Sequence, residues 1–301
     1  MERQRIIKGL KHPKYFFIFF LQEYLAKILS DTTYIKWIYR LRIGKNFHID
    51  NPVTFNEKMS WLKLNDHNPL YTTLADKYEV KSYVANKIGT QYVVENYGVY
   101  DKWSDIDFDK LPDQFVMKGT HDSGGAFVCR GKNNFDFEAT RKRVEANLAT
   151  NCFYKSREWP YKNIKPRIII DKMLDDHTGN ELRDFKFWCF NGKPTYMYCT
   201  VKAKEIYENF YDMDFNPVMI DHGFPRHQPE FDKPAEFEEM KRLAFKLSEG
   251  FPFIRVDFFD VEGHVYFGEY TFYDWGATMP FGGDWDERLG ALLELPEKNN
   301  E

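Results

Sequence analysis

The sequence lacks the features of membrane-spanning, disulfide-bonded and nucleic-acid-binding proteins. The apolar run Tyr15–Phe20 is followed at once by Gln22 and Glu23, so it is too short to span a bilayer, and no signal peptide is evident. None of the four cysteines belongs to a C-x-x-C pair, which favours buried thiols in a reducing cytoplasm. The net charge of −4 over 301 residues gives no basic excess, so we expect no nucleic-acid partner.

The charge is nevertheless uneven along the chain. Residues 1–46 hold ten lysines and arginines against three acidic residues, a net charge of +7 that leaves −11 for the remainder. A basic segment suits an anionic membrane surface or a phosphate-bearing, lipid-linked glycan. The aromatic face of a helix at Tyr15–Phe20 either packs on the body or enters a membrane interface, and we expect packing first. We expect a cytoplasmic protein, with a peripheral position at the inner face of the membrane as the alternative.

Hydrophobic spacing predicts a helical front followed by small antiparallel sheets. Apolar residues recur at helical spacing in three segments, residues 14–42, 51–61 and 74–89. Thr54 and Glu57 form the pattern of a capping box at the start of the second segment. Shorter runs rich in aromatic and β-branched residues follow, separated by turn residues. We predict an α+β protein with a helical region at 1–75, a small lobe at 76–170 and a large lobe at 171–301.

A glycine-rich loop joins two predicted strands in the middle of the chain. Lys118 ends the strand 114–118, and the loop 119–125 contains three glycines and His121. A P-loop passes from strand to helix and carries its lysine at the end of the loop, so this loop is of another kind. We predict a hairpin flap whose backbone N–H groups close over phosphates while Lys118 reaches in from the strand. An ordinary flexible hairpin tip is the simpler alternative, and His121 either touches substrate or is solvated.

A second hairpin, near the C-terminus, places charged residues on one face of a strand pair. We predict a loop of three residues, 261–263, closed by a glycine, which sets Arg255 opposite Glu269. A two-residue loop would send Asp257 and Glu269 to opposite faces. In the three-residue register these carboxylates can share Mg²⁺, which takes one or two protein carboxylates and completes its shell with water and phosphate oxygens. The simpler alternative is a salt bridge between Arg255 and Glu269, with Asp257 facing water.

Together these motifs resemble a known enzyme family. The strand-borne lysine with its flap and the Arg-x-Asp and Glu pair come in the order of ATP-grasp enzymes. Four segments look like the TupA-like ATP-grasp family of teichuronopeptide biosynthesis: Phe55–Lys58, Asp76–Val80, Asp184–Gly192 and Phe267–Phe272. The resemblance runs from about residue 35 to the C-terminus. It implies a two-lobed ATP-grasp fold, an enzyme that uses ATP and Mg²⁺, and a place in bacterial capsule or cell-surface polysaccharide biosynthesis.

The resemblance also implies roles for individual residues. ATP phosphates would be contacted by Lys77 and Lys118, and covered by a flap of Thr120, Ser123, Gly124 and Gly125. The adenine would lie along Asp171, Lys172 and Leu174, and the ribose against Asp184. Mg²⁺ would be held by Asp257 and Glu269, with Arg255 and Lys118 acting on the transferring phosphoryl group. The sequence departs from the common pattern at Thr271, where ATP-grasp ligases often carry Asn, and at Asp171, where Glu is commoner.

Four activities fit these residues. The first is an ATP-dependent carboxylate–amine ligase that works through an acyl phosphate and joins an amine or amino acid to a uronic acid or sugar unit. The second is a glycosyltransferase that uses a nucleotide sugar, because Asp212–Asp214 has the D-x-D form. The third is a glycan kinase, which needs a general base such as Asp274 or Asp286. The fourth is a nucleotide-binding protein without turnover.

Overall fold

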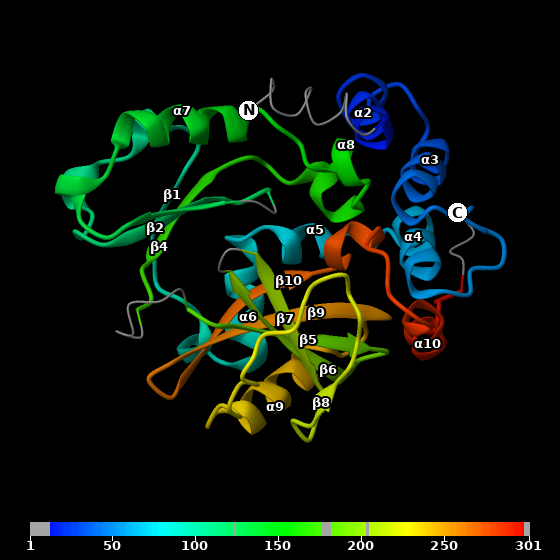
Figure 1. Ribbon diagram of the computed structural model, residues 1–301. Coiled ribbons are helices and arrows are strands. Elements are labelled where there is room, and N and C mark those ends of the chain that lie inside the picture. Colours follow the sequence, from blue (N-terminus) through cyan, green and yellow to red (C-terminus); the bar gives the residue numbers. More distant parts are fainter. Residues whose placement is uncertain (1–12, 123–124, 176–181, 203–204, 298–301) are drawn as a thin grey trace.

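Two antiparallel sheets form the framework of the computed structural model, which describes residues 13–122, 125–175, 182–202 and 205–297 (Figure 1). The smaller sheet has the strand order β1 (Asn96–Tyr100), β4 (Ile168–Lys172), β2 (Phe115–Gly119), β3 (Ala126–Cys129). The larger sheet has the order β10 (His264–Thr271), β9 (Phe253–Val261), β5 (Asp184–Phe190), β6 (Lys193–Lys202), β7 (Ile206–Tyr211), β8 (Pro217–Val218). All described strand pairs are antiparallel, which confirms the predicted α+β class.

Helices surround both sheets and form most of the first ninety residues. The α-helices are α2 (Pro13–Phe20), α3 (Asp31–Ile43), α4 (Phe55–Asn65), α5 (Leu70–Ala75), α6 (Glu79–Ile88), α7 (Phe137–Leu148), α8 (Phe153–Ser156), α9 (Phe237–Ser248) and α10 (Trp285–Leu292). A π-helical turn, η1 (Leu21–Leu25), continues α2, and short 3₁₀ turns include η6 (Trp159–Asn163) and η7 (Asp274–Ala277). The capping box predicted at Thr54 and Glu57 is present at the start of α4.

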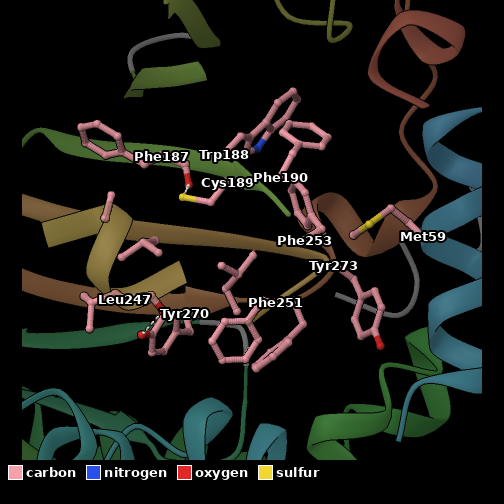
Figure 2. Close-up of a cluster of buried hydrophobic side chains, with 14 of the residues drawn as sticks. Met59, Phe187, Trp188, Cys189, Phe190, Leu247, Phe251, Phe253, Tyr270 and Tyr273 are labelled. Carbon is pink, nitrogen blue, oxygen red and sulfur yellow. Dashed lines mark hydrogen bonds between the residues drawn. The ribbon is translucent and has the colours of Figure 1, made fainter. Parts of the chain in front are cut away.

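The largest hydrophobic core lies on the six-stranded sheet (Figure 2). Trp188 of β5 is fully buried there, and its ring contacts Phe253 of β9. Leu247 of α9 is fully buried in the same core. Helices α4, α5 and α6 contribute to the same core. A second core holds α7 against the four-stranded sheet, and a third joins α2, η1 and α3 to one another. Helix α3 also contributes Ile35 and Tyr39 to the largest core, so it connects α2 and η1 to the body of the protein.

The loop of the C-terminal hairpin differs from our prediction. It consists of two residues, Glu262 and Gly263, and Val261 pairs with His264 across it. Both loop residues have positive φ, 53° and 77°, as a type I′ turn requires. The three-residue register is therefore wrong, because the turn accommodates the non-glycine Glu262 in the left-handed region.

We expected a two-residue loop to place Asp257 and Glu269 on opposite faces of the hairpin, but a β-bulge prevents this. The pairing of β9 with β10 shifts between Phe267 and Glu269, so that Glu269 lies directly opposite Asp257. The extra residue is Gly268, where an added Cβ would lie 3.1 Å from the carbonyl oxygen of Asp257. The bulge thus returns both carboxylates to one face, with Cβ atoms about 5 Å apart as in any directly opposed pair.

Candidate active site between the two sheets

A cavity of about 210 Å³ lies between the two sheets, and seven of the predicted site residues line it. Lys77 comes from the start of α6, and Lys118, Gly125 and Asp171 come from the four-stranded sheet and its flap hairpin. Asp184, Asp257 and Glu269 come from β5, β9 and β10 of the larger sheet. Residues separated by almost two hundred positions thus face one enclosed space, which we call the nucleotide cavity.

Lysines gather on one wall of the nucleotide cavity around the buried carboxylate of Asp171. The Nζ atoms of Lys81 and Lys118 lie 3.0 Å and 3.8 Å from its two oxygens. Burial lowers the pKa of Lys81, and Asp171 acts in the opposite direction. We had not predicted Lys81, which lies in the first turn of α6, four residues after Lys77 in the turn that precedes the helix. Asp171 holds two cations in place and also accepts an amide hydrogen bond from Asn96.

The root of the flap is tied to the start of α6. The backbone N–H of Lys77 donates to the carbonyl oxygen of Thr120 at 3.1 Å, and its Nζ contacts the carbonyl and carboxylate oxygens of Asp122. The Thr120 hydroxyl is buried and donates to the carbonyl oxygen of Lys165 at 3.2 Å, so it holds the loop root in place. The predicted flap residues Ser123 and Gly124 lie outside the described residues.

His121 is neither solvated nor directed at the cavity, so both of our expectations for it are wrong. Only 2% of the residue is exposed, and its Nε2 lies 3.2 Å from the carbonyl oxygen of Asn147 in α7. The side chain of His121 therefore points into the protein, where the imidazole packs beneath the flap against α7. Lys172 and Leu174 follow Asp171 where the chain leaves the smaller sheet; Lys172 is exposed and Leu174 half-buried, and the cavity lining contains neither.

Arg255 is not part of the lining of the nucleotide cavity, but it sits among three carboxylates, two of which, Asp257 and Glu269, line the opposite wall. Its guanidinium donates two hydrogen bonds of 2.7 Å to Asp257 and one of 3.0 Å to Glu269, and it also contacts Asp274. Asp257 and Asp274 are buried, so our alternative of a water-facing Asp257 is wrong. Three carboxylates with one guanidinium carry a local charge of −2 when all are ionised. Asp257 and Asp274 are buried but the side chain of Glu269 is 40% exposed, so a further cation would meet this negative charge at Glu269.

The pKa values of these carboxyls differ, because those of Glu269 and Asp274 lie below the usual value and only that of Asp257 is raised. Burial opposes ionisation of Glu269, but Arg255, Lys77, Lys186 and Lys118 together hold its pKa below the usual value. Burial raises the pKa of Asp257 to about 7, although Arg255 and Lys186 act in the opposite direction. Lys77 and Lys118 therefore act on Glu269 across the cleft, while Arg255 alone does not offset the burial of Asp257.

Lys186 is a second site residue that we had not predicted. It pairs with Asp257 across β5 and β9, is almost fully buried, and its Nζ lies 2.6 Å from the carboxylate of Asp184. The alternation of Asp184, Lys186 and Trp188 along β5 was visible in the sequence, but nothing in it showed which face met Asp257. Lys186 thus pairs with Asp184, which lines the nucleotide cavity, and lies opposite the metal-ligand candidate Asp257.

The described donor set fits Mg²⁺ bound together with phosphates. Within residues 13–122, 125–175, 182–202 and 205–297, no group of three or more His, Cys, Asp or Glu side chains is arranged to hold a metal ion. Asp257 and Glu269 supply two carboxylates as a direct cross-strand pair, and the Thr271 hydroxyl lies 3.4 Å from Glu269. Two protein carboxylates are what Mg²⁺ commonly takes when substrate phosphates complete its shell.

One family model and several solved structures are similar to this chain. The family model described as TupA-like ATPgrasp matches residues 57–294. Similar solved structures include a D-alanine–D-alanine ligase from Bacillus anthracis (16% identity, TM-score 0.38, 73% of this chain, 59% of that chain) and an L-amino acid ligase from Bacillus licheniformis (11%, 0.41, 71%, 44%). This chain thus spans less than two thirds of the length of either protein, and likenesses this distant carry no argument about activity. No curated protein matches the chain.

Proposed function

The chain belongs to the TupA-like ATP-grasp family, and from that premise we propose that it is an ATP- and Mg²⁺-dependent ligase joining a carboxylate to an amine. The observation that carries this proposal is the nucleotide cavity, with lysines on one wall and the pair Asp257 and Glu269 on the other. Such an arrangement suits a triphosphate, because both walls supply or bind positive charge along the phosphates.

The reaction proceeds in two steps. An oxygen of the substrate carboxylate bonds to the γ-phosphorus of ATP as the bond to the bridging oxygen breaks, which gives an acyl phosphate and ADP. The amine nitrogen then bonds to the acyl carbon, phosphate leaves with its oxygen, and the nitrogen loses a proton. Both steps develop negative charge on phosphate oxygens, so the site needs fixed cations more than acid–base groups.

The described residues supply those cations. Lys77, Lys81 and Lys118 would neutralise phosphate oxygens from the side of the smaller sheet, with Asp171 fixing the spacing of Lys81 and Lys118. Arg255, whose planar fork binds Asp257, would act on the transferring phosphoryl group through its positive charge. Mg²⁺ held by Asp257 and Glu269 would add positive charge at the terminal phosphates. The hairpin of β2 and β3 would cover the acyl phosphate and exclude water.

We further propose that the carboxylate belongs to a uronic acid or related sugar unit and that the amine belongs to an amino acid. The support for this finer statement is the resemblance to a family found in bacterial capsule and cell-surface polysaccharide gene clusters. On this proposal the protein works at the cytoplasmic side of that pathway.

The alternatives receive less support from the described residues. Asp212 of the D-x-D motif accepts the backbone N–H groups of Asp214 and Asn216 at 2.9 Å and 2.8 Å, so it closes a turn. Asp274, a candidate base for a kinase, accepts hydrogen bonds from Trp188 and Arg255, and Asp286 accepts two from Asn56. These acids hold the fold together and leave the ligase as the best-supported activity.

Product analysis tests the ligase proposal. With ATP, Mg²⁺, a panel of uronic acids and a panel of amino acids, we expect ADP and phosphate in equal amounts, together with an amide, only when both an acid and an amine are supplied. ADP without phosphate would show a kinase, and release of UDP from a nucleotide sugar with ATP unused would show a glycosyltransferase. Either result would replace the ligase proposal.

A further inference from the structure

A second cavity, of about 400 Å³, lies next to the nucleotide cavity, and Glu269 lines both. Arg255 and Asp274 face the second cavity, so the carboxylate cluster separates the two spaces. The opposite wall comes from the N-terminal helices, through Gln22 and Arg42, and from the region of α8. A molecule in this cavity would meet the terminal phosphate of a nucleotide at Glu269.

The lining of the second cavity combines cations, hydroxyls, an aromatic side chain and the carboxyl groups of Glu158, Glu269 and Asp274, the last two of which are bound to Arg255. Arg42 and Lys155 are exposed, and within the described part of the chain neither forms an ion pair. Ser156, Thr271 and Thr278 bring hydroxyls, and Trp275, 43% exposed, offers an indole face. Hydroxyls and an aromatic face suit a sugar ring, while two cations without partners suit an anionic group.

Backbone strain marks the same wall. Trp275, Gly276 and Ala277 all have positive φ, 48°, 62° and 53°, which is costly for the two residues that carry a Cβ. The buried Lys63 fixes this segment, because its Nζ donates to the carbonyl oxygens of Gly276 at 2.6 Å and Ser156 at 2.8 Å. The fold thus maintains an unfavourable conformation that directs Trp275 to the cavity.

We propose that the second cavity binds the carboxylate substrate, and that this substrate is a sugar acid that also carries a phosphate group. This inference rests on the proposed ligase function. The sugar's carboxylate faces the nucleotide, its ring lies against Trp275, and its phosphate is held by Arg42 of α3 and Lys155. Helix α3 is then a specificity element that the N-terminal region contributes to the active site.

Calorimetric titration in the presence of Mg²⁺ and a non-hydrolysable ATP analogue tests the proposal. The probes are glucuronic acid 1-phosphate, glucuronate and glucose 1-phosphate. We expect the first to bind at least about tenfold more tightly than either of the others, since each lacks one of the two anionic groups. Arg42→Glu should reduce the affinity for glucuronic acid 1-phosphate about tenfold or more and leave that for glucuronate nearly unchanged.

Two controls make the outcome decisive. Lys36→Glu changes the charge of α3 equally at an exposed position outside the cavity lining, and should leave all three affinities unchanged. Lys155→Glu should repeat the effect of Arg42→Glu, while the affinity for the ATP analogue stays as in the wild type. Equal binding of the three probes, or the same effect from Lys36→Glu, would overturn the cavity assignment even if amide formation were observed. Probe binding without any amide product would instead refute only the ligase.

An independent observation concerns the outer face of the same N-terminal helices. Seven large apolar side chains are exposed there: Tyr15, Phe16, Phe17, Phe20, Tyr24, Ile28 and Trp37. A groove of about 420 Å³ with almost no polar lining runs between α2, η1 and α3. We expected this aromatic face to pack on the body of the protein, but these seven side chains are exposed in the described structure.

We infer that this outer face docks on the interface of an anionic membrane. Charge complementarity supports this occupant, because residues 1–46 carry a net charge of +7 and the rest of the chain −11. The exposed aromatic side chains are flanked by Lys14, Lys27 and Lys36. Aromatic and basic residues together are typical of a segment that lies in a membrane interface. No helix in the described ranges is long and apolar enough to cross a bilayer.

Vesicle sedimentation tests the membrane inference. We expect the full chain to sediment with phosphatidylcholine vesicles that contain 30% phosphatidylglycerol, roughly tenfold more than with phosphatidylcholine alone. The double substitution Phe17→Glu and Trp37→Glu should abolish that difference, and Phe245→Glu, at a 53% exposed position on α9, should not. Equal sedimentation of the wild type and the double variant would refute the inference, as would a wild-type dimer that Trp37→Glu dissociates.

Discussion

Asp257→Asn should lower the rate of ATP-dependent amide formation roughly 100-fold or more. Asparagine keeps the size of the side chain and one oxygen, but it removes the charge from one of the two carboxylates that face each other across β9 and β10. The variant should also need far more Mg²⁺ for any remaining activity. Steady-state assays of ADP release over a range of Mg²⁺ concentrations measure both effects.

Asp232→Asn provides the matched control for this substitution, because Asp232 is exposed and lies outside the cavity lining. It should retain wild-type activity and wild-type dependence on Mg²⁺. Circular dichroism should show that both variants are folded. A folded Asp257→Asn variant with nearly full activity would remove the carboxylate pair from the mechanism.

Arg255→Met should destabilise the fold by about 3–5 kcal/mol, because it removes the only guanidinium among three carboxylates and leaves buried Asp257 and Asp274 without their counter-ion. Methionine fills similar space, so most of the loss is electrostatic. Urea unfolding at pH 7 measures the change in the free energy of unfolding. Activity should fall as well, since the transferring phosphoryl group loses a fixed cation.

Arg255→Lys separates charge from packing in this prediction. It keeps a positive charge but loses the two parallel hydrogen bonds to Asp257, so it should recover a substantial part of the stability and little of the activity. A loss below about 1 kcal/mol in Arg255→Met would show that the carboxylates are satisfied by other groups, contrary to the charge imbalance derived above.

Local sequence patterns were sufficient for several parts of the site. The strand–flap–strand order placed Lys118, and the Arg-x-Asp spacing placed Arg255 and Asp257 on one face of β9, because side chains alternate along a strand. The carboxylate pair was also predicted, but from an incorrect register. Turn length alone could not reveal the bulge at Gly268, since its cause is the close approach of the glycine to the Asp257 backbone.

Residues whose role depends on long-range contacts were not predictable. Lys81 and Lys186 look like ordinary solvated lysines in the sequence, and only the packing of α6 and the pairing of β5 with β9 bring them to Asp171 and Asp257. The second cavity has the same origin, because Arg42 reaches it only through the docking of α3 beside the carboxylate cluster. No spacing rule links positions more than two hundred residues apart.

A crystal structure of the wild-type chain with ADP and Mg²⁺ tests the central claim most directly. We predict that the metal ion contacts Asp257 and Glu269, and that the phosphates lie between this pair and the amino groups of Lys77 and Lys118. Nucleotide bound elsewhere on the protein, or a metal ion held by phosphates with neither carboxylate in contact, would contradict the account.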